Sequence, residues 1–96
     1  MKAFTTKALQ DHMHQLKNLA IAKKQYEDRA NKKIEEFTAA AATVVSYMGM
    51  NPKYDSFLEQ QAEISANMAA SRDAKNKWFD ELEAEMQAEF LASLQD

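Results

Sequence analysis

The residues that form turns are confined to one short segment near the middle of the chain. Among 96 residues there is one glycine, Gly49, and one proline, Pro52. A sandwich or barrel of many strands needs a turn roughly every 8–12 residues, so this scarcity argues against such folds. Gly49 suits the residue after a helix, where positive φ is common, and Asn51 with Pro52 suits the start of the next helix. The sequence therefore predicts a hairpin with its turn at about residues 49–53.

The segments on either side of this turn have the composition of helices. Alanine, lysine, glutamate and methionine, which favour helix, are abundant. We expect an all-α fold, a single helical-hairpin domain over residues 1–96, with helix one at about 6–48 and helix two at about 52–94. Thr5 is the expected cap of helix one, and Ser56 with Glu59 offers a later start for helix two through a capping box.

Apolar or small residues recur every three or four positions in both segments, as on one face of a helix. In helix one the expected stripe is Leu9, Leu16, Leu19, Tyr26, Ala30, Ile34, Phe37, Ala41, Val44 and Met48. In helix two it is Phe57, Gln61, Ile64, Met68, Ser71, Lys75, Trp78, Leu82, Met86 and Phe90. A break of helix one within residues 22–33, giving a compact bundle of shorter helices, is the alternative, but that segment contains no glycine or proline.

The two arms of the hairpin carry opposite net charge. Residues 1–48 sum to +3 and residues 49–96 to −6. If the chain folds back at the turn, positions whose numbers add to about 102 lie opposite each other, and Lys23 and Lys24 then face Asp80 and Glu81. Exposed ion pairs stabilise by only about 0–1 kcal/mol each, so we interpret the pattern as setting the register.

A lone pair of helices leaves several large apolar residues without cover. Trp78 and Phe79 are adjacent, and adjacent residues point about 100° apart on a helix, so one of them lies off the seam between the helices. The other expected off-seam residues are Val45, Tyr47, Met50 and Leu91. We therefore expect a second layer, formed either by homodimerisation into a four-helix bundle or by docking on another protein.

No constellation of catalytic or metal-binding residues is present in the sequence. There is no cysteine, and His12 and His14 stand two positions apart, which directs them to different helix faces. The Glu-x-x-His motif of di-metal helical bundles does not occur. We therefore expect no enzyme activity, no cofactor and no metal, and we interpret His12 as a half-buried packing residue.

Three glutamates, Glu81, Glu85 and Glu89, share one face of helix two. They could form an acidic docking strip, a partial mimic of nucleic-acid phosphates, or a solvated face beside the basic arm. The sequence pI of about 5.4 and the absence of a DNA-binding motif argue against nucleic-acid binding. No apolar run approaches the roughly 20 residues that span a bilayer, and no signal peptide opens the chain, so we expect a cytoplasmic protein without a membrane contact.

The candidate partner-binding residues are flexible or aromatic side chains and the acidic strip. Methionine adapts to varied binding surfaces, and buried aromatics dominate interface energies. The expected set is Tyr47, Met48, Met50, Tyr54, Trp78, Phe79, Glu81, Glu85 and Glu89. The sequence favours a small helical inhibitor, adaptor or chaperone that acts by docking on a larger protein. One alternative is a self-assembling structural subunit, such as a scaffold or secretion-needle-like hairpin. Another is an acidic-face mimic or a weakly nucleic-acid-associated protein.

Overall fold

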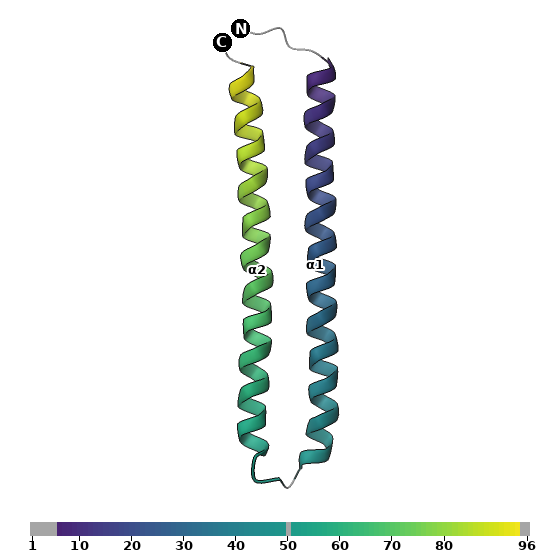
Figure 1. Ribbon diagram of the computed structural model, residues 1–96, viewed down its shortest axis with the longest axis vertical. Coiled ribbons are helices and arrows are strands. Elements are labelled where there is room, and N and C mark those ends of the chain that lie inside the picture. The colour runs from purple at the N-terminus through teal and green to yellow at the C-terminus, as the bar shows by residue number, and fades with distance from the viewer. Residues whose placement is uncertain (1–5, 50, 95–96) are drawn as a thin grey trace. The chain divides into compact units, whose positions relative to one another are not determined.

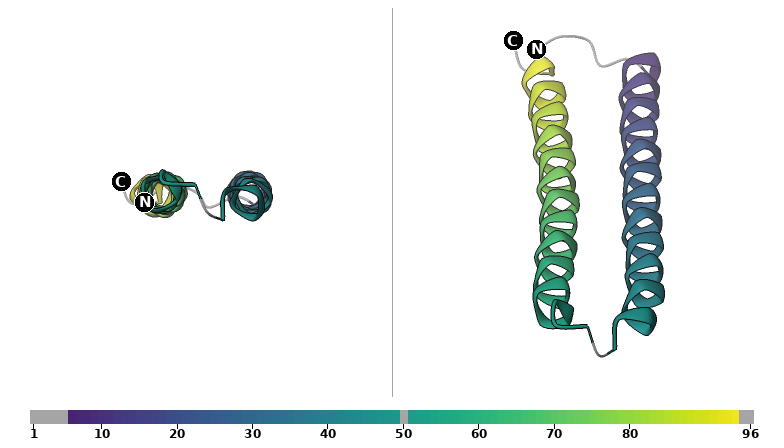
Figure 2. Two further views of the ribbon diagram at one scale, coloured as in Figure 1. Left: turned by 90° about the horizontal axis from the view of Figure 1, so that it is seen from below. Right: turned by 60° about the horizontal axis from the view of Figure 1, so that its bottom comes forward.

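Two long helices account for nearly all of the computed structural model, which describes residues 6–49 and 51–94. Helix α1 spans Thr6–Met48 and helix α2 spans Tyr54–Ser93, and no strand occurs in these ranges. The prediction of an all-α hairpin is confirmed (Figure 1). Helix α1 runs without a break through residues 22–33, so the compact bundle of shorter helices is wrong (Figure 2). The expected cap at Thr5 lies outside the described residues.

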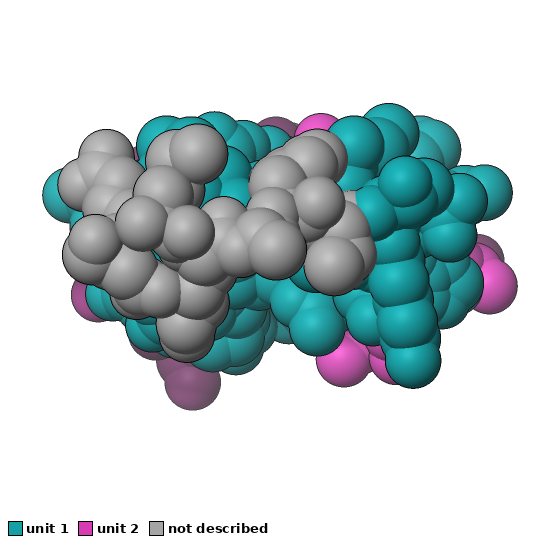
Figure 3. All heavy atoms as spheres, turned by 90° about the horizontal axis from the view of Figure 1, so that it is seen from above, with its two compact units in different colours: residues 1–26, 75–96 teal, residues 27–74 magenta. Residues whose placement is uncertain are grey.

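The contacts between the helices divide the chain into two units, coloured separately in Figure 3. Unit 1 combines Met1–Tyr26 with Lys75–Asp96, and unit 2 is the continuous segment Glu27–Ala74. Within each unit, a stretch of α1 packs antiparallel against a stretch of α2. All contacts described below lie inside one unit or the other.

The turn in unit 2 depends on Asn51 more than on Gly49. The Asn51 side-chain oxygen accepts a hydrogen bond from the Lys53 amide at 2.8 Å, and its carbonyl accepts one from the Tyr54 amide at 3.0 Å. Asn51 thus closes the turn that leads into α2, but the helix begins at Tyr54, so both expected starts, at Pro52 after an Asn51 cap and at Ser56, are wrong. The expected left-handed Gly49 is wrong, because Gly49 does not have a positive φ.

The register predicted from the charges is present in both units. In unit 1 the His12 ring stacks on Phe90, and the Lys23 ammonium lies 2.6 Å from an Asp80 carboxylate oxygen. In unit 2 the Arg72 guanidinium donates to the Asn31 side-chain oxygen at 3.0 Å. The numbers of each of these pairs add to 102 or 103, which matches the expected value of about 102.

Seven of the ten positions of the predicted α2 stripe are half-buried in the seam, and the other three are exposed. The half-buried or buried positions include Ser65, Arg72 and Phe79, where we expected Ile64, Ser71 and Trp78. The reason lies in the steps of three and four residues that a helical seam requires. Steps of three and four add up to seven residues. A seam that includes Ser71 and Trp78 would next include the charged Glu85, whereas a seam that includes Arg72 and Phe79 next includes the apolar Met86. In α1, Val45, which we expected off the seam, is half-buried. Val44, which we expected on the seam, is exposed.

Polar side chains occupy the middle of the seam, as the sequence indicated. Lys23, Asn31, Arg72 and Lys75 are all half-buried. Asn76 carries a buried side-chain oxygen that has no hydrogen-bond partner among the described residues. A buried acceptor of this kind costs about 1–3 kcal/mol. The seam therefore stabilises the hairpin less than an apolar seam of equal length.

We predict that Gly49→Ala leaves the hairpin folded and stabilises it. A Cβ added at Gly49 meets no atom within 4 Å, and the backbone there is not left-handed. Replacing glycine at such a site lowers the entropy of the unfolded chain, which is worth about 0.4–1 kcal/mol. Urea unfolding followed by circular dichroism measures the change. A loss of stability larger than this gain would show that Gly49 needs a conformation that alanine resists.

The second prediction separates the two adjacent aromatics. Phe79 is 7% exposed, whereas Trp78 is 47% exposed. Removing a buried phenylalanine ring costs about 3–5 kcal/mol, so Phe79→Ala is expected to unfold much of the hairpin at room temperature. Trp78→Ala is expected to cost less than half as much free energy of unfolding. Urea unfolding of both variants at one protein concentration tests this order, and equal losses would contradict it.

Candidate interaction surfaces

The four residues predicted at the hairpin tip do not form one exposed patch. Tyr47 is 86% exposed, the highest value among the large hydrophobic residues of the described chain. Met48 and Tyr54 are half-buried in the seam of unit 2, and Met50 lies outside the described residues. Among the tip residues that the structure describes, Tyr47 is therefore the one whose side chain is largely exposed to a partner.

An aromatic cluster in unit 1 surrounds one lysine. The ring centroid of Phe79 lies 6.2 Å from that of Tyr26 and 5.0 Å from that of Trp78. The Lys75 ammonium sits 4.1 Å from the Trp78 centroid and 5.9 Å from the other two centroids. Phe79 is thus the aromatic residue that packs between the helices. Trp78 packs against the Lys75 ammonium, and about half of the Trp78 surface remains exposed. Part of Trp78 is already used within the chain, which reduces the area available for a partner.

The three predicted glutamates lie on the surface of unit 1. Glu81, Glu85 and Glu89 are all exposed, and their spacing places them along one side of α2. Asp80, next to the first of them, forms the ion pair with Lys23 across the helices. We call Glu81, Glu85 and Glu89 the acidic stripe. It begins next to Asp80, whose charge is paired with Lys23, and continues as exposed negative charge toward the end of α2.

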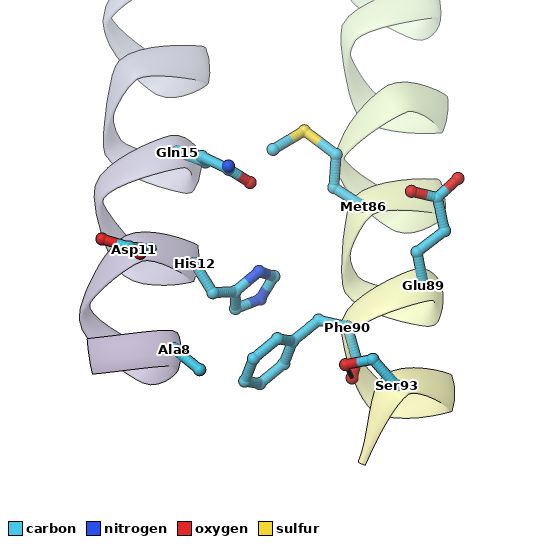
Figure 4. Close-up of a pocket in the computed structure, with 8 residues that line it drawn as sticks. All are labelled: Ala8, Asp11, His12, Gln15, Met86, Glu89, Phe90 and Ser93. Carbon is cyan, nitrogen blue, oxygen red and sulfur yellow. Dashed lines mark hydrogen bonds between the residues drawn. The ribbon is translucent and has the colours of Figure 1, made fainter. Parts of the chain in front are cut away.

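A shallow groove of about 290 Å³ lies between α1 and α2 in unit 1 (Figure 4). His12 and Phe90 point into it from opposite helices, with their rings 4.0 Å apart and only 5° from parallel. His12 is half-buried, as predicted, and the ring stack explains its burial. The rim is mainly polar, formed by Asp11, Gln15, Glu89 and Ser93 with Ala8 and Met86. A groove with two stacked rings already filling its floor serves helix packing.

Sequence reasoning missed part of the exposed apolar surface. Tyr47, Leu91 and one of Trp78 and Phe79 were expected off the seam, but five further large hydrophobic residues are also exposed. These are Met13, Ile21, Val44, Leu58 and Ile64. For two of these residues the signal was the choice between neighbours: because Val45 and Ser65 lie half-buried in the seam, Val44 and Ile64 before them project outward.

The described part of the chain holds no group of three or more His, Asp or Glu side chains placed to bind a metal ion. Neither described helix contains a stretch apolar and long enough to cross a bilayer. Comparison with known proteins adds no assignment, because no family model, no curated protein and no solved structure matches the chain. The arguments for function are therefore those of the surface itself.

We predict that Lys75→Met changes the environment of the single tryptophan. Methionine keeps an unbranched apolar side chain at the seam but removes the cation that lies over the Trp78 ring. The expected result is a shifted Trp78 emission maximum. Lys77→Met is the control, because Lys77 is exposed and only two residues away. Equal spectra for Lys75→Met and the unmodified protein would contradict the contact.

Proposed function

We propose that this chain is a non-catalytic protein–protein interaction module, a small helical inhibitor, adaptor or chaperone that docks an apolar and charged helical face on a larger protein. The observation that supports this function is the imbalance between buried and exposed hydrophobic residues. In the described chain Phe79 is the one hydrophobic residue that is buried, while eight large ones are exposed. Exposed apolar area of this kind is typical of surfaces that bind other proteins.

The candidate docking residues are Trp78 and the acidic stripe in unit 1 and Tyr47 in unit 2. Tryptophan and tyrosine contribute strongly to binding because a large ring leaves water without much loss of conformational freedom. Exposed glutamates beside an aromatic anchor add electrostatic steering toward a basic partner. The docking helix would then lie in a groove of the partner through residues three and four positions apart.

The same exposed residues also support a second candidate, a structural subunit that assembles with copies of itself. A contact that does not close into a ring or a dimer continues into a filament. The two candidates differ in the masses of the complexes that they form, so one experiment compares them.

The experiment places a photo-crosslinking phenylalanine analogue at Tyr47 or Trp78 in the cells that make the protein. An interaction module is expected to give a discrete adduct at either position. Its mass exceeds 10.9 kDa by that of the partner, whereas a polymerising subunit gives a ladder of multiples of 10.9 kDa. Glu59, an exposed residue of α2, is the control position. If neither aromatic position gives more adduct than the Glu59 position, the interaction function is wrong.

A further inference from the structure

The helix pair of unit 1 has two sides that differ in charge. Consecutive residues of a helix point about 100° apart, so residues just before and just after the seam residues project to opposite sides. Because the helices are antiparallel, the residues before the seam on α1 and on α2 share one side. The charged residues in this set are Asp11, Glu81, Glu85 and Glu89, all exposed. With Trp78, which precedes the buried Phe79, they form what we call the acidic side of unit 1.

The other side of unit 1 carries charges of both signs. The charged residues that directly follow a seam residue there are Lys17, Lys24, Lys77, Asp80 and Glu83. The remaining lysines that the structure describes in unit 1 belong to neither side. Lys23 and Lys75 are half-buried in the seam, and Lys7 lies on the outward face of α1. The acidic side is therefore the one that combines several carboxylates with no base.

The groove in Figure 4 shows that both helices contribute to the acidic side. Its rim includes Asp11 and Gln15 from α1 and Glu89 from α2, and each of these residues directly precedes a seam residue. The stacked rings of His12 and Phe90 fill the floor. What the groove offers to another molecule is therefore its polar and acidic rim.

The carboxylates of the acidic side are not neutralised within the described chain. None of the four forms an ion pair there, whereas Asp80, on the other side, is paired with Lys23. The glutamates of the acidic stripe stand four residues apart on one helix, and like charges at this spacing repel each other. A positively charged partner would offset this repulsion, so the charges of this side complement a basic surface.

The spacing of the charges and the exposed tryptophan indicate which basic partner fits. Residues four apart on a helix are about 6 Å apart along its axis, so arginines or lysines four apart on a second helix stay in phase with all three glutamates. Trp78, 47% exposed, adds an apolar contact at one end of the stripe. Nucleic acids and anionic lipid surfaces carry the same sign of charge and are repelled. A basic helix of a protein is the partner that matches both features.

We propose that a basic helix of the larger protein docks along the acidic side of unit 1, with arginines or lysines on the acidic stripe and an apolar residue on Trp78. This inference rests on the proposed interaction function and names the chemistry of the partner. From Trp78 to Glu89 this side extends about 17 Å, which corresponds to three turns of helix. The basic helix then forms one wall of the groove in which α2 lies.

The test uses a synthetic helix as a probe for the partner. The probe is a hydrocarbon-stapled peptide of arginine, leucine and alanine, about 15 residues or roughly 22 Å long, with arginines four apart on one side and leucines beside them. A control peptide has the same composition but its arginines are spread around the helix. Neither peptide contains an aromatic residue, so the emission of Trp78, the single tryptophan of the chain, reports binding. The titrations are made at about 0.15 M salt, where charges more than about 8 Å apart are largely screened.

Two matched pairs of variants locate the site. Glu85 and Gln15 lie on the acidic side, Glu83 and Gln10 lie on the other side, and all four are exposed. Glu85→Gln is expected to weaken probe binding about two- to fivefold because one exposed ion pair is lost, and Gln15→Arg by a similar factor through repulsion. Glu83→Gln and Gln10→Arg are expected to change the affinity by less than about 1.5-fold, because salt screens charges on the far side. Circular dichroism checks that all four variants keep their helix content.

The expected result is saturable binding of the probe, with a blue-shifted Trp78 emission and a higher affinity than the control peptide has. No saturable binding, equal affinity for the two peptides, or equal losses from Glu85→Gln and Glu83→Gln would each overturn the inference. Any of these results leaves the interaction function standing where crosslinking from Trp78 or Tyr47 gives a discrete adduct. Absence of such an adduct rejects the interaction function even where the probe binds.

Discussion

In each unit, a seam between antiparallel stretches of α1 and α2 holds the chain together, and its capacity for burial is limited. Each helix can place a stripe of side chains against the other, and every other side chain faces outward. In the described residues this arrangement buries Phe79 and leaves the rest of the seam half-buried. The stability of the hairpin thus depends on few side chains, and its surface carries apolar groups that a larger core would have covered.

The polar residues of the seam explain how two helices with so few buried contacts keep one register. Lys23 pairs with Asp80, and Arg72 donates to Asn31. Sliding one helix by a turn would break both the Lys23–Asp80 ion pair and the Arg72–Asn31 hydrogen bond. Lys75 serves a related purpose, because its ammonium is placed among three aromatic rings. The polar seam therefore selects an alignment at some expense in stability.

The proposed function follows from the same limitation. A hairpin that cannot cover Tyr47, Ile64 or Trp78 by itself gains free energy when another helical surface covers them. The acidic stripe of unit 1 suits a basic protein surface, and Tyr47 in unit 2 adds an exposed aromatic ring to the surfaces that we propose for docking.

The sequence by itself determined the helices, the position of the turn and the register. A single glycine and proline close together leave one place to reverse direction, and opposite charges on the two arms align only when the numbers of facing residues add to about 102. The sequence could not decide between Trp78 and Phe79, or between Ile64 and Ser65, because neighbouring residues fit the same steps of three and four. The tertiary structure made that choice, since the seam through Phe79 continues to Met86 and avoids burying Glu85. The structure also decided the conformation of Gly49 and the identity of the exposed apolar residues, because both depend on how the second helix packs on the first.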